Sequence, residues 1–187
     1  RDWSSDVCSS DLGIWPYVRG WDGQHQPLPI SEAVVLPPNS VFIPQRAYFP
    51  QGSLRNALCY PDTEHTFTDE QLHEALTLAL LPQLASQLDV VGQWNQQLSG
   101  GEAQRLAMAR VFLRQPSWVF ADEATSALDE VTEKIIYERL LQMVMKKQGA
   151  LVSVAHRPSV AAYHQRLWQL VNVNEGSIKS HVLQVSH

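Results

Sequence analysis

Two carboxylates at the end of an apolar run are the residues of this sequence best placed to do chemistry. Asp122 and Glu123 follow the run Trp-Val-Phe-Ala at 118–121. Such a run is typical of a buried parallel strand, and open α/β sheets bind ligands outside the carboxyl ends of their strands. Successive side chains point in different directions there, so we expect Asp122 to reach the hydration shell of a Mg²⁺ and Glu123 to face a water that attacks a phosphate. The alternative is that the two acids begin a helix.

A glycine-containing turn upstream could hold an anion. The sequence Leu-Ser-Gly-Gly-Glu occupies 98–102, and Ser99 with Glu102 matches the S-x-x-E pattern that caps a helix. Gly100 and Gly101 allow close approach of an anion, and the first N–H groups of a helix attract a phosphate. Strong helix formers follow, with Leu106, Ala109 and Leu113 on one side. Taken alone, the segment is also compatible with an ordinary capped helix.

Parallel strands must position these groups. Residues 41–43 predict a core strand that leads to Gln45, after a proline-rich stretch at 24–40 with loops around one short edge strand. A further apolar run at 151–155 predicts a strand that ends at His156. Gln45 and His156 would then each follow a predicted strand.

Helices are predicted between and after these strands. Thr68 and Gln71 match a capping box, and the spacing that follows predicts a short amphipathic helix with Leu72, Ala75, Leu76, Ala79 and Leu80 on one face. A second helix is expected over 129–145, with Gly149 beyond its end and an apolar face of Ile136, Leu140, Met143 and Val144. We expect the chain to close with a strand at 166–173, a turn at 174–176 and a short tail.

In this order, the motifs resemble the second half of an ABC-type ATPase domain. The resemblance implies an α/β fold: a truncated ABC-type P-loop ATPase domain with a helical signature subdomain at about 50–115, inserted after the loop of Gln45. It assigns catalysis to Glu123 and to His156, which contacts the γ-phosphate, and it assigns Mg²⁺ contacts to Asp122 and Gln45. It assigns nucleotide contacts to Gln45, Ser99, Gly100, Gly101, Glu102 and Asp129.

Further motifs narrow the resemblance to one group of half-transporters. They lie at 15–17, 20, 44–48, 52–56, 60–62, 156–159 and 163–164. These stretches are similar to peroxisomal fatty-acyl transporters and their bacterial permease-ATPase relatives. The resemblance implies ATP hydrolysis that energises transport, with ATP and Mg²⁺ bound. It also implies a membrane domain upstream on the same chain, a homodimer partner met by the 126–129 loop, and a location on the cytoplasmic face of the cell inner membrane.

One element of that family does not occur in this sequence. The pattern G-x-x-x-x-G-K-[ST], whose loop holds the β- and γ-phosphates, is missing. We therefore expect the chain alone to bind ATP poorly and to be inactive. Residues 1–12 match nothing in the family at that position, so we expect a foreign segment there, followed by a partial ABC ATPase domain at 13–187. A genuine polar N-terminal arm is the alternative.

Composition is compatible with one α/β domain. The chain has 187 residues, 44% of them hydrophobic, which is enough for a core. A formal net charge of −5 gives no electrostatic basis for a nucleic-acid partner. No apolar run has the length of a bilayer span, since the longest candidate, 75–81, is followed by Pro82. Cys59 is expected to be a reduced, partly buried thiol.

Two other functions share some of these features. Soluble ABC ATPases of DNA repair and translation carry the same signature, but in the repair enzymes a long coiled coil precedes it, and sustained heptads are missing between Gln45 and Ser99. A nucleotide-free regulatory module would explain the missing phosphate loop. The Asp122–Glu123 pair argues against that module, because uncompensated neighbouring carboxylates are typical of working sites.

Overall fold

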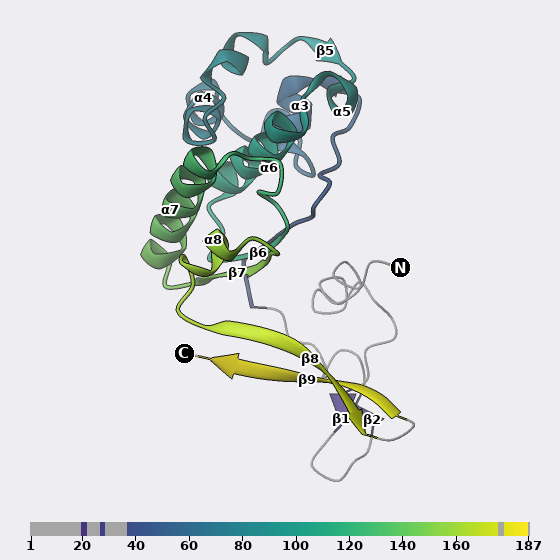
Figure 1. Ribbon diagram of the computed structural model, residues 1–187. Coiled ribbons are helices and arrows are strands. Elements are labelled where there is room, and N and C mark those ends of the chain that lie inside the picture. The colour runs from purple at the N-terminus through teal and green to yellow at the C-terminus, as the bar shows by residue number, and fades with distance from the viewer. Residues whose placement is uncertain (1–19, 22–26, 29–36, 176–177, 187) are drawn as a thin grey trace. The chain divides into compact units, whose positions relative to one another are not determined.

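The structure is a computed structural model that describes residues 20–21, 27–28, 37–175 and 178–186 (Figure 1). The chain divides into two compact units, with the division between Ala155 and His156. The segment 1–12 and the motif at 15–17, on which two of our expectations rest, lie outside the described residues. The two units are described in turn.

A parallel sheet forms the core of the first unit. It contains β3 (Ser40–Ile43), β6 (Trp118–Asp122) and β7 (Ala150–Val154), with β6 in the middle. All three strands were predicted from their apolar runs, and the structure confirms them. Ile43 pairs with Ala121, and Asp122 pairs with Val154. The carboxyl ends of the three strands therefore lie at one edge of the sheet.

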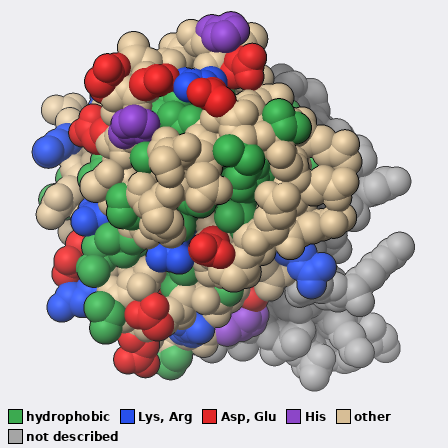
Figure 2. Space-filling view, turned by 90° about the horizontal axis from the view of Figure 1, so that it is seen from above, with side chains coloured by type: hydrophobic (Ala, Val, Ile, Leu, Met, Phe, Trp, Pro, Cys, Tyr) green, Lys and Arg blue, Asp and Glu red, His purple; other side chains and the backbone are tan. Residues whose placement is uncertain are grey.

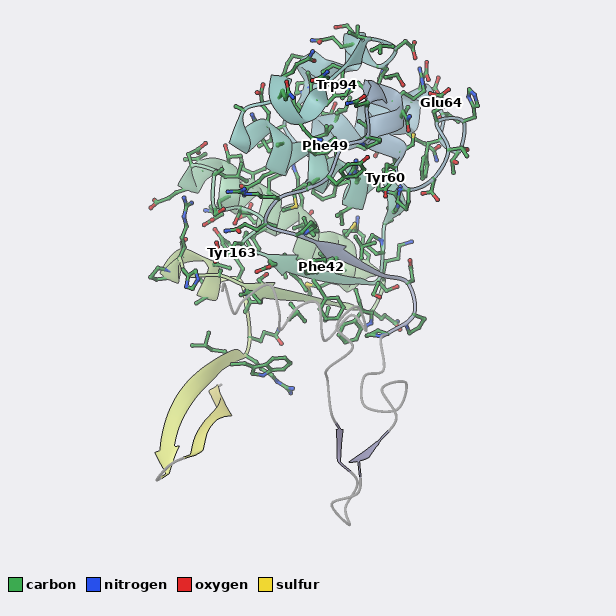
Figure 3. The ribbon with its side chains drawn as sticks, turned by 90° about the vertical axis from the view of Figure 1, so that its right-hand side faces the viewer. Phe42, Phe49, Tyr60, Glu64, Trp94 and Tyr163 are labelled. Carbon is green, nitrogen blue, oxygen red and sulfur yellow. The ribbon has the colours of Figure 1, made fainter. Side chains whose placement is uncertain are left out.

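The segment between β3 and β6 is mostly helical. It contains five helices: α3 (Leu54–Cys59), α4 (Asp69–Leu78), the 3-10 helix η1 (Pro82–Gln87), α5 (Trp94–Gln97) and α6 (Gly100–Arg114). The expectation of an all-helical insert needs one correction. The short strands β4 (Gly52–Ser53) and β5 (Val91–Gly92) pair antiparallel within it. The indole N–H of Trp94 donates to the Gly52 carbonyl at 3.1 Å and supports that pairing (Figure 3).

Helix α4 begins where the sequence predicts, but it ends at Leu78, before the last two residues of the predicted apolar face. Thr68 and Gln71 form the capping box, and the predicted apolar face is buried at Leu72, Ala75, Leu76 and Ala79. Leu80, which was expected on the same face, has a positive φ of 60° and lies past the helix. Leu81 is buried instead. Because the backbone reverses at Leu80, Leu81 takes the buried position that was expected for Leu80.

Helix α6 is buried on more than the one side that was expected. Leu106 and Ala109 are buried as predicted, but Leu113 is only half-buried, and Met108 and Phe112 are fully or almost fully buried. The reason is that α6 has neighbours on several sides, because it packs against α3, α4, α7 and β3. A helix enclosed in this way does not show a single apolar stripe.

Helix α7 (Glu130–Lys146) connects β6 to β7 and packs against β7. The predicted face is buried at Ile136, Leu140 and Val144, whereas Met143 is half-buried. Gly149 follows the helix, as expected, for a steric reason. A Cβ at this position would collide with the backbone carbonyl of Ser117, so only glycine allows the chain to enter β7 here.

The second unit contains α8 (Pro158–Ala161) and a hairpin of β8 (Leu167–Glu175) with β9 (Ile178–Ser186). Two expectations for this region were wrong. Asn174 and Glu175 belong to β8 and pair with Lys179 and Ile178, so they are not in a turn. The expected short tail is the strand β9, which pairs with β8 along its whole length.

Three further observations complete the description of the fold. The strands β1 (Gly20–Trp21) and β2 (Pro27–Leu28) pair antiparallel. Among the described residues, no helix combines the length and apolar character that crossing a membrane requires. The face of the molecule shown in Figure 2 intersperses acidic and basic side chains with small hydrophobic groups.

Candidate functional site

The strand register brings Gln45 and Glu123 together. Each residue lies two positions past a paired residue, since Ile43 of β3 is opposite Ala121 of β6. Nε2 of Gln45 donates a hydrogen bond to Oε2 of Glu123 at 2.6 Å. A donor this close to a carboxylate makes a charge-assisted bond, which is stronger than a bond between neutral groups. The structure thus joins two of the expected site residues at the carboxyl edge of the sheet.

Asp122 and Glu123 have different environments although they are neighbours. Asp122 ends β6 and is only 4% exposed. Glu123 is half-buried and has a positive φ of 44°, and its N–H donates to the Val154 carbonyl at 2.9 Å. The alternative that the two acids begin a helix is wrong, because the next helix starts at Glu130. The left-handed backbone at Glu123 is a strained conformation of the kind found at functional sites.

The donor atoms at this edge suit a magnesium ion. Asp122 offers carboxylate oxygens, and the Gln45 amide keeps its oxygen for a ligand while its nitrogen donates to Glu123. Mg²⁺ prefers such oxygen ligands, and it usually takes one or two protein carboxylates and completes its shell with phosphates and water. In the described part of the chain, no group of three or more His, Cys, Asp or Glu residues could hold a metal. Asp122 and Gln45 would by themselves leave most of the ligand shell of Mg²⁺ to phosphate and water.

A capping box starts helix α6. Ser99 is the N-cap, and its hydroxyl oxygen accepts from the Glu102 N–H at 3.3 Å. Oε2 of Glu102 accepts from the Ser99 N–H at 3.0 Å and from the Ser99 hydroxyl at 2.7 Å. These bonds hold the pKa of Glu102 below its ordinary value, and the bond from the Ser99 hydroxyl has the largest effect. Glu102, expected among the nucleotide contacts, therefore has a capping role in this structure.

The first turn of α6 packs against the segment that follows Glu123. A Cβ added to Gly101 would lie 3.2 Å from the Ala127 carbonyl oxygen, and one added to Gly100 would lie 3.5 Å from the Ala127 Cβ. Gly101 thus allows α6 to lie close to the Ala127 carbonyl, and a larger residue would push the two segments apart. The two predicted sites, the glycine turn and the acidic pair, belong to one packed structure.

Gln104 is a residue of this site that the sequence did not predict. Its side chain, 9% exposed, bonds to Glu123, Ser126 and Ala127. The available signal was a polar residue at a core position of a helix: Gln104, Met108 and Phe112 recur at intervals of four, and all three are buried. A buried amide is expected to have hydrogen-bond partners, although the sequence does not say which.

Asp129 caps α7. Oδ1 accepts from the Thr132 N–H at 2.9 Å, and Oδ2 accepts from the Thr132 hydroxyl at 2.8 Å. These bonds, led by that of the backbone N–H, lower the pKa of Asp129. Just upstream, the hydroxyl of buried Thr125 donates to the carboxylate of buried Glu133 at 3.0 Å. The segment between Glu123 and α7 is therefore held by specific polar contacts.

His156 follows β7 by two residues and is exposed. It begins the second unit, so it is described apart from Gln45 and Glu123. Its expected contact with a γ-phosphate stays a prediction.

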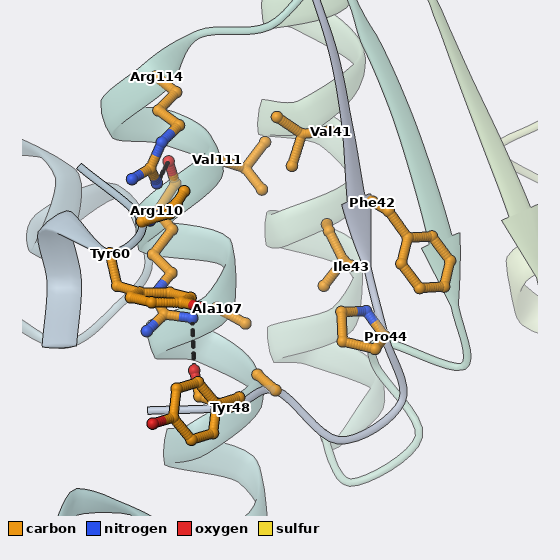
Figure 4. A pocket seen from close by; sticks show the side chains of 12 residues that line it. Val41, Phe42, Ile43, Pro44, Tyr48, Tyr60, Ala107, Arg110, Val111 and Arg114 are labelled. Carbon is orange, nitrogen blue, oxygen red and sulfur yellow. Dashed lines mark hydrogen bonds between the residues drawn. The ribbon is translucent and has the colours of Figure 1, made fainter. Parts of the chain in front are cut away.

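Two arginines near the other end of α6 hold the segment that follows Gln45. Arg110 donates to the Tyr48 carbonyl at 2.8 Å (Figure 4). It also donates to the Ala57 carbonyl at 2.8 Å, and its guanidinium lies 4.5 Å from the centre of the Phe49 ring. Burial lowers the pKa of Arg110 to about 10, so the side chain stays charged at neutral pH. Arg114 bonds to Asp62 at 2.9 Å.

A cavity of about 390 Å³ lies between β3 and α6 beside these arginines. Tyr48 and Tyr60 stand at its wall, with Ile43 and Val111 opposite (Figure 4). Through these contacts α6 connects the segment after Gln45, at one end, to the acidic segment, at the other.

Comparisons with known proteins identify the family of this chain. The profile of the family described as "ABC transporter" matches residues 23–126, which is more than half of the chain. An "Uncharacterized ABC transporter ATP-binding protein" of Haemophilus influenzae is 36% identical over 88% of this chain and 25% of its own length. "ATP-binding cassette sub-family D member 1" of Drosophila melanogaster is 34% identical over 87% of this chain and 23% of its own length. The chain thus spans about a quarter of the length of these relatives.

A solved structure supports the same fold. It is described as "Structure of a bacterial Atm1-family ABC exporter with ATP bound", and it matches 90% of this chain and 30% of its own chain. The TM-score is 0.67 at 21% sequence identity, so the likeness concerns the fold.

Proposed function

The chain belongs to the ABC transporter family, and we propose that it supplies the catalytic carboxylate, the glutamine loop and the signature helix with which a membrane transporter hydrolyses ATP. The observation that carries this proposal is the contact between Gln45 and Glu123 at the end of β6. It joins a carboxylate able to accept a proton to an amide able to orient a water. These are two of the protein groups that serve in-line attack on a γ-phosphate.

Glu123 acts as the general base in this proposal. Its carboxylate takes a proton from the attacking water, and the Gln45 amide fixes the direction in which that carboxylate points. His156, placed after β7 in the chain, donates to the γ-phosphate and stabilises the charge that develops there. When bound, Mg²⁺ neutralises phosphate charge, and Asp122 with the Gln45 oxygen would hold it.

The signature turn acts on the nucleotide of a second ATPase domain. Ser99, Gly100 and Gly101 stand at the positive end of the α6 dipole, where a phosphate is favoured. The phosphate loop that holds the rest of the nucleotide comes from outside this sequence. We propose a homodimer of such domains, each joined to a membrane domain at the cytoplasmic face of the cell inner membrane, with residues 126–129 between the two domains.

The test is Mg²⁺-dependent ATP hydrolysis by the full-length transporter. The variant Asp122→Asn keeps the size of the side chain and removes one charged ligand, so half-maximal activity should need more Mg²⁺. The exposed Asp89→Asn is the matched control. A wild-type protein without ATPase activity, or an Asp122→Asn variant with an unchanged Mg²⁺ requirement, would contradict the proposal.

The signature contact has its own test in mixed dimers. A Ser99→Ala subunit is combined with a partner that carries a wild-type signature and a dead phosphate loop. One complete site then forms, and we expect measurable hydrolysis. A mixed dimer as inactive as either parent would rule out a contact between subunits.

A companion test uses the 187-residue chain by itself. Calorimetric titration with Mg-ATP should give an affinity no tighter than roughly millimolar, because a phosphate loop supplies several charge-assisted hydrogen bonds worth about 1.5–3 kcal/mol each. Micromolar binding would contradict the role we give to a loop outside this sequence.

A further inference from the structure

We infer that Gln104 is a positioning residue for the proposed hydrolysis, one that fixes the backbone of Glu123 to the signature helix. The inference rests on the proposed function for its effect on activity, but its structural basis is independent of it. Gln104 lies on α6, five residues after the N-cap Ser99, and its side chain is 9% exposed.

The amide of Gln104 makes contacts along the whole segment after β6. Nε2 donates to the Glu123 carbonyl at 3.3 Å and to the Ser126 hydroxyl at 3.0 Å. Oε1 accepts from the Ala127 N–H at 2.8 Å. A glutamine amide has one acceptor and two donor hydrogens, so both ends of this amide are used by one short segment.

The Glu123 contact supports a backbone conformation that needs support. The φ of Glu123 is 44°, a strained conformation for a residue other than glycine, and such a conformation persists only when neighbours hold it. The Val154 carbonyl accepts from the Glu123 N–H on one side, and Gln104 donates to the Glu123 carbonyl on the other. The peptide groups that set the direction of the Glu123 side chain are thus held from β7 and from α6.

The same helix carries the glycine turn, so Gln104 also couples the two proposed sites. The Gly101 position packs on the Ala127 carbonyl, and Gln104 binds the Ala127 N–H. A movement of the α6 N-terminus would therefore displace the peptide groups on both sides of Ala127. Through the Glu123 carbonyl it would also change the direction of the catalytic carboxylate.

Two variants in the full-length transporter separate this role from packing. Gln104→Met keeps the volume and removes all the amide contacts. Gln104→Glu keeps the acceptor for the Ala127 N–H but removes the donor to the Glu123 carbonyl. We expect both to lower kcat about tenfold, the effect of losing one well-placed hydrogen bond worth about 1.4 kcal/mol, with ATP affinity unchanged within about twofold. Gln142→Met, at an exposed position of α7, is the matched control.

Hydrogen exchange gives a readout that does not depend on hydrolysis. In the peptide that contains Ala127, Gln104→Met should lose amide protection and Gln104→Glu should retain it. Wild-type kcat in Gln104→Met, or equal protection of the Ala127 amide in Gln104→Met and the wild type, would overturn the inference. If the wild type itself lacked ATPase activity, the proposed function would fail, and the exchange comparison would still decide whether Gln104 holds this segment.

Discussion

The side-chain amide of Gln45 donates to the carboxylate of Glu123 across 2.6 Å, and the two residues follow neighbouring parallel strands. The contact fixes the direction of the Glu123 carboxylate. A carboxylate held in this way is oriented for proton transfer, while the Gln45 oxygen is not used by this contact.

Removing this partner should lower turnover without abolishing nucleotide binding. In Gln45→Ala, the Glu123 carboxylate keeps its charge but loses its orienting donor. We expect kcat to fall about tenfold or more, since a misplaced general base loses much of its contribution. ATP affinity and kcat are measured on the same preparation, with the exposed Gln83→Ala as control. Unchanged kcat in Gln45→Ala would show that this contact does not serve catalysis.

Alanine at the two signature glycines should affect stability differently. Replacing a helical glycine by alanine stabilises by up to about 1 kcal/mol. Gly100→Ala should show this gain, because its new Cβ makes an ordinary 3.5 Å contact with Ala127. Gly101→Ala places a Cβ 3.2 Å from the Ala127 carbonyl, so the gain should be lost. Urea denaturation of the two variants measures the difference, and equal free energies of unfolding would contradict the packing described for α6.

Asp129 gives a pH-dependent prediction. Its pKa is lowered in the folded chain from an ordinary value of 3.8, chiefly by the Thr132 N–H, so its charge stabilises the fold above that pH. The stabilisation is lost as pH falls through the lower, folded value. Asp129→Asn keeps a capping oxygen without the charge. The difference in Tm between wild type and Asp129→Asn should therefore shrink as pH is lowered below about 4. A Tm difference that stays constant down to about pH 3 would contradict this role of the Asp129 charge.

The arginine contacts of α6 should not be replaceable by lysine. Lysine cannot reach the carbonyls of Tyr48 and Ala57 together, so Arg110→Lys leaves at least one of these acceptors without its donor. We expect a loss of about 2 kcal/mol in the free energy of unfolding. The exposed Arg46→Lys, by contrast, should change it by less than about 0.5 kcal/mol. Equal stabilities of the two variants in urea denaturation would show that the Arg110 contacts contribute little.

The parts of the fold that sequence predicted are those set by local pattern. The capping boxes of Thr68 and Ser99 and the apolar runs of the parallel strands are short-range signals, and the structure confirms each of them. The strand β9 was missed because a turn was expected at 174–176, whereas Asn174 and Glu175 continue β8, and because the sequence of β9 does not alternate between polar and apolar residues. Leu80 was misplaced because a single backbone reversal ends α4.

The site was less predictable than the strands that carry it. The contact between Gln45 and Glu123 depends on which strands are neighbours and on their register. Neither property can be read from the sequence around Gln45 or Glu123. The contacts of Gln104 depend on a left-handed residue at Glu123, for which a glutamate gives no signal. The capping roles of Glu102 and Asp129 could be expected from spacing, but they compete with the ligand contacts that the family resemblance assigns to the same side chains.

The most direct test of the account compares nucleotide binding with hydrolysis in one variant of the full-length transporter, Glu123→Gln. The amide keeps the size of the carboxylate but cannot accept the proton of the attacking water. We predict ATP affinity within about threefold of the wild type and phosphate release slowed by about a hundredfold or more. The exposed Glu138→Gln should behave as the wild type. Near-normal phosphate release from Glu123→Gln would contradict the account.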